Sequence, residues 1–103
     1  MGLFQKFKEF IKPDPEIDFQ LALREESFSR NFEKAAWLYQ KAVDQGHYKA
    51  MYFLAELYLR GRGVKQDVNK ALKLLADSSN AGYDKATDLL SKIETGEYQI
   101  SEE

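Results

Sequence analysis

The sequence contains no cysteine among its 103 residues, which excludes disulfide bonds and thiolate metal sites. It contains a single histidine, His47, so a zinc site built from several imidazoles and a cysteine–histidine nucleophile are also excluded. We therefore expect no metal and no cofactor. His47 is expected to serve in packing and hydrogen bonding, directly after the end of a helix.

Long hydrophobic runs are missing too. No stretch approaches the roughly 18 apolar residues of a membrane helix. The opening stretch MGLFQKFKEFIKPDPE mixes Lys6, Lys8 and Glu9 into its apolar residues, so it lacks the uninterrupted apolar region of a secretory signal. The formal net charge of −2 is too small to attract nucleic acid. We expect a cytoplasmic protein without a nucleic-acid partner.

Proline is scarce, and both copies, Pro13 and Pro15, lie in one breaker near the start. Elsewhere apolar residues recur every three to four positions, which predicts an all-α domain. The predicted helices cover residues 3–11, 16–27, 32–45, 48–60, 68–80 and 84–95. This divides the chain into an amphipathic helix (1–12), a helical domain (16–95) and an acidic tail (96–103) that we expect to fray.

Residues 33–57 repeat as residues 69–93, at an offset of 36. Small residues, leucines and glycines match best, in the pairs Ala35 with Ala71, Leu38 with Leu74, Gly46 with Gly82, Ala50 with Ala86, and Leu54 with Leu90. These residue types set helix packing and helix ends. Asn31, Asp67 and Asp84 stand where N-caps are expected.

The middle of the chain resembles the Sel-one-like repeat (SLR) family, a relative of the tetratricopeptide repeat. The matching residues are Tyr39, Lys41, Ala42, Gln45, Gly46, His47, Ala50, Leu54, Tyr58, Gly61, Gly63, Val64, Asp67, Lys70 and Ala71. Ala55 replaces a family glycine. The resemblance implies a short right-handed α-α superhelix of about two repeats, with a C-terminal capping helix. It also implies a non-enzymatic adaptor that holds segments of other proteins.

Two motifs suggest chemistry only superficially. Gly61-x-Gly63 lacks a third glycine at the dinucleotide-binding spacing and a following Lys-Ser/Thr, so we interpret it as the turn between two helices. Asp14, Glu16, Asp18 and Glu25 have calcium-loop spacing, but Phe19 stands where such a loop needs glycine. With no catalytic pair evident, we expect no enzymatic activity.

A binding face is expected on the concave side, lined by the first helix of each pair. The candidate contacts with a protein partner on the middle first helix are Met51, Tyr52, Phe53, Glu56, Leu59 and Arg60. Tyr52 and Phe53 have the alternative of packing on neighbouring helices. Trp37 is a further candidate, because its repeat equivalent is the polar Lys73.

The predicted N-terminal helix carries an apolar stripe of Phe4, Phe7, Phe10 and Ile11 that needs a partner. Our preferred hypothesis is that this helix folds back onto the first repeat and covers Trp37. Docking on another protein or a second copy, and binding to a membrane surface, are the alternatives.

The sequence favours a module that binds one protein partner, as a monomer or weak homodimer. A toxin-neutralising (immunity) protein is the first alternative, with acidic residues facing a basic toxin: Glu25, Glu26, Glu33, Glu97, Glu102 and Glu103. A membrane-peripheral adaptor anchored by residues 1–12 is the second.

Overall fold

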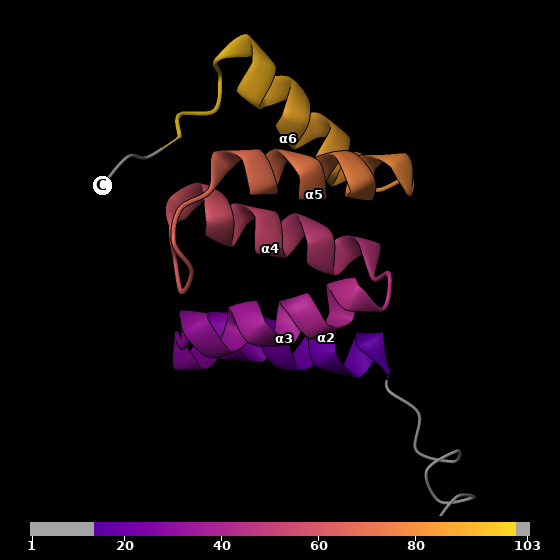
Figure 1. The fold of residues 1–103 in the computed structure, drawn as a ribbon, viewed down its shortest axis with the longest axis vertical. Coiled ribbons are helices and arrows are strands. Elements are labelled where there is room, and N and C mark those ends of the chain that lie inside the picture. The colour runs from indigo at the N-terminus through magenta and orange to yellow at the C-terminus, as the bar shows by residue number, and fades with distance from the viewer. Residues whose placement is uncertain (1–13, 101–103) are drawn as a thin grey trace, which may run out of the picture.

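The computed structural model describes residues 14–100, and within them the chain forms five α-helices, one π-helical turn and no strand. The elements are α2 (Pro15–Arg24), η1 (Glu25–Ser29), α3 (Phe32–Asp44), α4 (Tyr48–Arg60), α5 (Val68–Asn80) and α6 (Asp84–Thr95). From α3 to α6 the helices follow one another along the long axis, and α2 overlaps α3 in this view (Figure 1). The all-α repeat solenoid is thereby confirmed. The helix predicted for residues 3–11 lies outside the described residues.

Several helices begin at residues whose side chains cap the first turn. The side chains of Asp14, Asn31 and Asp67 accept hydrogen bonds from backbone N–H groups in the first turns of α2, α3 and α5. The prediction for Asp84 was wrong, because Tyr83 takes the N-cap position of α6 without a side-chain hydrogen bond. Asp84 is instead the first helical residue, where its carboxylate lies near the positive end of the helix dipole.

The two predicted repeat units have the same backbone at their helix ends. Gly46 and Gly82 both have positive φ, +85° and +95°. The next residues, His47 and Tyr83, donate their N–H groups to the carbonyls of Ala42 and Ser78, both at 3.1 Å. Since the positive-φ glycines and the hydrogen bonds of the residues after them correspond at an offset of 36, the sequence repeat is also a structural repeat.

Packing follows the chain, so that α2 lies on α3, α3 on α4, α4 on α5, and α5 on α6. Small side chains at the contacts bring the helices close together. The core consists of one tyrosine, one phenylalanine and many alanines and leucines: Phe19, Ala22, Ala35, Ala36, Leu38, Tyr39, Ala42, Ala50, Leu54, Ala55, Leu57, Leu59, Ala71, Leu74, Leu75, Ala86 and Leu89. The buried Ser78 donates its hydroxyl to the Tyr48 carbonyl at 2.7 Å, so α5 is also tied to α4 by a polar contact.

Candidate functional site

The first helices of the successive pairs are α2, α4 and α6, and the surface that they share is called the first-helix face here. Aromatic rings join these helices. Phe19 of α2 lies 5.6 Å from Phe53 of α4, centroid to centroid. Tyr52 of α4 lies 5.5 Å from Tyr83, the residue that caps α6. Such ring contacts connect the first helices of successive pairs.

Three side chains of α4 form a stripe along the middle of this face. Tyr52, Glu56 and Arg60 are four residues apart and therefore lie on one side of the helix. Burial raises the pKa of the Glu56 carboxyl, and the Arg60 guanidinium partly opposes that rise. Glu26 of η1 and Lys85 of α6 also act on Glu56, which places it between these two elements.

Burial also raises the pKa of the Tyr52 phenol to about 12, and Glu56 adds to the rise. The phenol is therefore protonated at neutral pH and able to donate a hydrogen bond. Glu56 has no hydrogen bond and no ion pair within 4 Å to any residue of the described range 14–100. The stripe thus presents a donor, an unpaired carboxylate and a guanidinium in a row.

Two of the predicted contact residues do not belong to this face. Leu59 is fully buried in the core, so it offers no surface to a partner. Met51 packs against the core and lies five residues before Glu56, which turns it roughly 140° away around the helix. In the sequence, both are apolar residues at positions that the repeat pattern does not fix. The pattern did not show that α4 is enclosed by α3 and α5 on two sides.

Of the other predicted contact residues, Phe53 packs against neighbouring rings and Trp37 is exposed. Phe53 is half-buried and its ring also lies 5.9 Å from that of Tyr39, so packing is a part of its role. Trp37 is 60% exposed on α3, with the Lys41 ammonium 4.8 Å from its ring centroid. The segment predicted to cover it lies outside the described residues.

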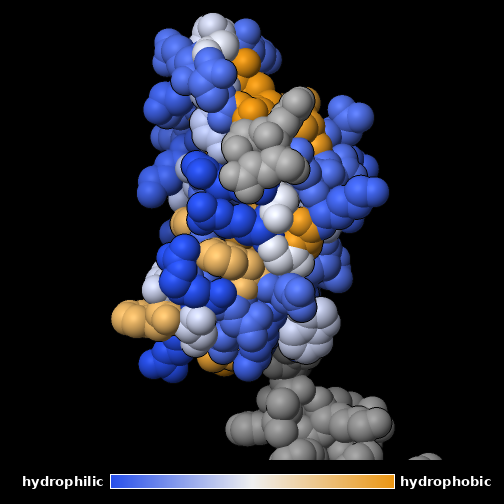
Figure 2. Space-filling model, turned by 90° about the vertical axis from the view of Figure 1, so that its left-hand side faces the viewer, coloured by the Kyte–Doolittle hydropathy of each residue, from blue (hydrophilic) through white to orange (hydrophobic). Residues whose placement is uncertain are grey.

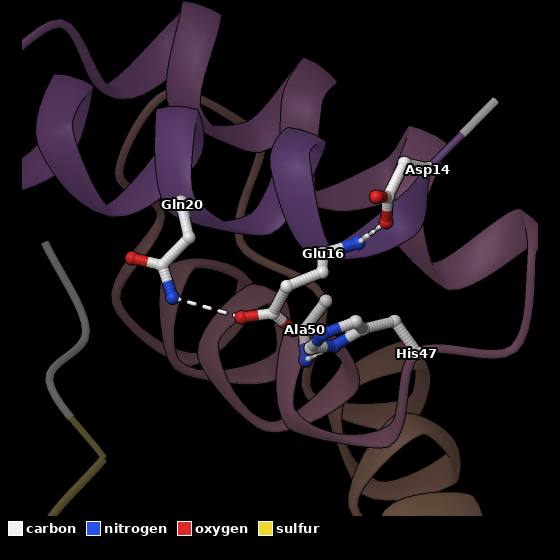
Figure 3. A network of polar contacts seen from close by, with 5 residues as sticks. All are labelled: Asp14, Glu16, Gln20, His47 and Ala50. Atoms are coloured by element: carbon white, nitrogen blue, oxygen red, sulfur yellow. Dashed lines mark hydrogen bonds and ion pairs between the residues drawn. The ribbon is translucent and has the colours of Figure 1, made fainter. Parts of the chain in front are cut away.

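His47 organises one end of the face, as Figure 3 shows. Its Nδ1 accepts the Ala50 N–H at 3.1 Å and so caps α4. The ring hydrogen is then on Nε2, which donates to the Glu16 carboxylate at 2.7 Å. Gln20 donates to the other oxygen of Glu16. These hydrogen bonds, from Gln20 first and His47 second, lower the pKa of Glu16. The expected packing role of His47 therefore includes a helix cap.

We expect His47→Ala to lower the free energy of unfolding by about 1 kcal/mol, because α4 loses its cap. His47→Asn should lose clearly less, since asparagine is a good N-cap even though it cannot reach Glu16 in the same way. Urea unfolding of the three proteins measures the difference. Equal losses for both variants would show that the cap contributes little and that stacking on Phe19, 4.5 Å away, dominates.

A second expectation concerns pH. Because the pKa of Glu56 is raised above its usual 4.5, the folded chain holds this proton at pH values where the unfolded chain has released it. Stability is therefore lost as the pH rises from 4.5 through the raised pKa. Glu56→Gln should gain about 0.5 to 1 kcal/mol over wild type at pH 7, a modest amount because the side chain is partly solvated, and nothing at pH 4. Thermal unfolding at both pH values tests this, with the exposed Glu94→Gln as the control.

Sequence reasoning missed the segment after α6. Tyr98 and Ile100 are half-buried and pack against the core, a contact that was not predicted for the tail. The Arg60 guanidinium carbon lies 6.0 Å from the Tyr98 ring centroid. The alternation of Tyr98 and Ile100 with polar residues was a signal that the sequence contained.

Other features of the described residues bear on function. An open groove of about 510 Å³ runs along α2 and η1, lined in part by Ile17, Leu21, Leu23 and Phe28. Within residues 14–100, no group of three or more His, Asp or Glu side chains is placed to hold a metal ion. In the same residues, no helix has both the length and the apolar character needed to cross a membrane.

A family model described as the Sel1 repeat matches residues 19–47 and 49–83. The first range spans most of α2 together with α3, and the second spans α4 with α5. Each match is therefore one helix pair, in which the first helix contributes to the first-helix face. No curated protein and no solved structure shows a significant match to the chain.

Proposed function

Since the chain belongs to the Sel1 repeat family, whose repeats mediate protein–protein interaction, we propose that it binds one protein partner through the first-helix face. The family is typically a non-enzymatic interaction module. The face proposed here is formed by Tyr52, Glu56 and Arg60 with the edge of Phe53. Trp37 belongs to α3, the second helix of its pair, and is left out of it.

The unpaired carboxylate of Glu56 is the observation that carries this proposal. The repeats satisfy their own packing with the alanines and leucines on the other sides of α4, and Glu56 takes no part in it. A half-buried carboxylate that has no hydrogen bond and no ion pair within 4 Å costs free energy, which the more distant charges of Arg60 and Lys85 offset only in part. A cationic group placed directly beside it would recover more of that energy. Glu26 lies near enough to act on Glu56 and adds a second negative charge. The partner is therefore expected to present a lysine or arginine side chain here.

Aromatic rings beside Glu56 suit the same ligand. Tyr52 and Phe53 meet edge to face at 5.3 Å, and Tyr52 lies one helical turn before Glu56. Lysine and arginine stems pack well on such rings, and their cationic ends are attracted to ring faces. Tyrosine and arginine are also the residue types that most often carry binding energy at interfaces.

Affinity purification from the source cell with quantitative mass spectrometry tests the proposal. The bait is compared with Glu56→Lys and Arg60→Glu, and with Lys73→Glu on the exposed side of α5 as the matched control. We expect one protein to be lost at least tenfold with both face variants and retained with the control. A partner retained by all three baits, each checked by circular dichroism, would place the binding surface elsewhere.

A toxin-neutralising role is a narrower form of the same proposal. Glu26 and Glu56 form an acidic centre that suits a basic toxin domain. Rescue of cells from a toxin encoded next to this protein, lost with Glu56→Lys, would support it. Survival that depends on neither Glu56 nor Arg60 would count against it.

A further inference from the structure

The chain after α6 turns back toward the body of the molecule. The helix ends at Gly96, in the left-handed conformation, and the Tyr98 N–H donates to the Lys92 carbonyl at 3.0 Å. The Gln99 side chain donates to the Gly96 carbonyl at 3.3 Å. The segment then lies on the side of the molecule where α4 ends (Figure 1).

Residues 97–100 show the alternation of an extended peptide lying on a surface. Glu97 and Gln99 are exposed, whereas Tyr98 and Ile100 are half-buried against the core. This period of two is the one in which successive side chains point to opposite sides. Seen from the end where α4 terminates, hydrophobic residues gather on the upper part of the surface, over α6, within a largely hydrophilic surround (Figure 2).

The segment meets the stripe of α4 at Arg60. The guanidinium approaches the face of the Tyr98 ring, at 6.0 Å from its centroid. Tyr98 is also among the groups that act on the Tyr52 phenol, two helical turns before Arg60. Part of the surface proposed for the partner is therefore already in contact with a piece of this chain.

A helix-ending motif alone does not account for this arrangement. Such a motif needs one hydrophobic contact at Tyr98, the residue whose N–H reaches back to Lys92. Ile100 lies two residues beyond Tyr98 and is nevertheless half-buried. The second buried position is the feature of a peptide seated in a groove, where alternate side chains enter pockets.

We propose that the end of the first-helix face between α4 and α6 is a groove for an extended peptide with an aromatic residue two positions before an aliphatic one. Residues 98–100 are its intramolecular occupant. This deepens the proposed function and rests on it. The partner contributes a segment of the same chemistry, which displaces residues 98–100 from the groove. Because the partner binds only when the groove is empty, the tail lowers the apparent affinity for the partner by the fraction of time that it fills the groove.

The test uses a fluorescent peptide of residues 96–103, GEYQISEE, and the full-length chain. The chain that carries both Tyr98→Ala and Ile100→Ala has an empty groove and should bind this peptide. A second peptide with the same two substitutions is the control and should bind at least tenfold more weakly. Wild-type chain should bind the first peptide at least tenfold more weakly than the double variant, because its own tail competes. Adding Arg60→Ala to the double variant should weaken binding of the peptide.

Equal binding of the two peptides by the double variant would overturn the proposal of a peptide groove. Equal binding of the first peptide by wild type and double variant would overturn the intramolecular occupancy, as would a wild-type dimer that exchanges tails and is absent from the double variant. If the double variant does not fold, Ile100→Asp alone replaces it, because Ile100 lies beyond the helix-ending hydrogen bonds. The peptide assay contains no partner, so a negative result leaves the partner-capture experiment standing as a separate test of the face.

Discussion

Replacement of Gly63 by alanine is expected to lower the free energy of unfolding by about 3 kcal/mol. Two effects add. Gly63 has φ of +71°, where a side chain is strained by about 1 to 2 kcal/mol. A Cβ there would also lie 2.3 Å from both the carbonyl carbon and the oxygen of Phe32. The obstacle is backbone of the first turn of α3, which cannot rotate aside, so the α4–α5 loop would have to leave α3.

Gly82→Ala is the matched control for this prediction. Gly82 has an equally unfavourable φ of +95°, but nothing lies within 4 Å of a Cβ built on it. Its replacement should therefore cost only the backbone strain, about 1 to 2 kcal/mol. Urea unfolding followed by circular dichroism gives both values. Similar losses for the two variants would mean that the loop does not depend on its close approach to α3.

Tyr39→Ala is the second substitution with a large expected effect, a loss of about 3 to 5 kcal/mol. Tyr39 is fully buried where α2, α3 and α4 meet, with its ring 6.1 Å from Phe19 and 5.9 Å from Phe53. Its removal leaves a cavity at the contact between the two repeat units. Helices α2 and α3 should then unfold before the rest, which hydrogen exchange would show as early loss of protection in residues 15–44.

Tyr39→Phe separates the hydroxyl from the ring. The hydroxyl donates to the Glu26 carboxylate at 2.7 Å, and burial together with Glu26 raises the pKa of Tyr39, so the phenol stays protonated. Loss of this hydrogen bond should cost about 1 to 2 kcal/mol. Thermal unfolding would measure it, and Glu26→Gln, which retains an acceptor oxygen, should cost less. A Tyr39→Phe chain as stable as wild type would show that the hydroxyl makes no contribution to stability.

The same geometry changes how binding experiments are best designed. Phe53 contacts Phe19, Tyr39 and Tyr52, so Phe53→Ala alters packing as well as the surface. A partner lost on that substitution would not distinguish a contact from a weakened fold. Glu56 and Arg60 are the sharper probes, since Glu56 makes no hydrogen bond within residues 14–100 and Arg60 is exposed.

Helix positions were predicted closely because their signals are local. Asn31 and Asp67 cap the helices that follow them, and Gly46 and Gly82 take the positive φ that ends the preceding ones. Each signal acts within one turn of backbone, so the amino-acid sequence is sufficient to find it. The π-helical turn at Glu25–Ser29 was not foreseen. It holds one more residue per hydrogen-bonded ring than an α-turn, and no residue type marks it.

The sequence by itself determined the helices, their caps and the repeat of 36 residues, because periodicity and capping depend on neighbours along the chain. Only the tertiary structure decided which sides of α4 are enclosed. It buried Leu59, turned Met51 away from the first-helix face, and brought Tyr98 to Arg60 across 38 positions of sequence. Burial depends on what packs against a residue from elsewhere in the chain, and a pattern that shows an apolar side chain does not show what will cover it.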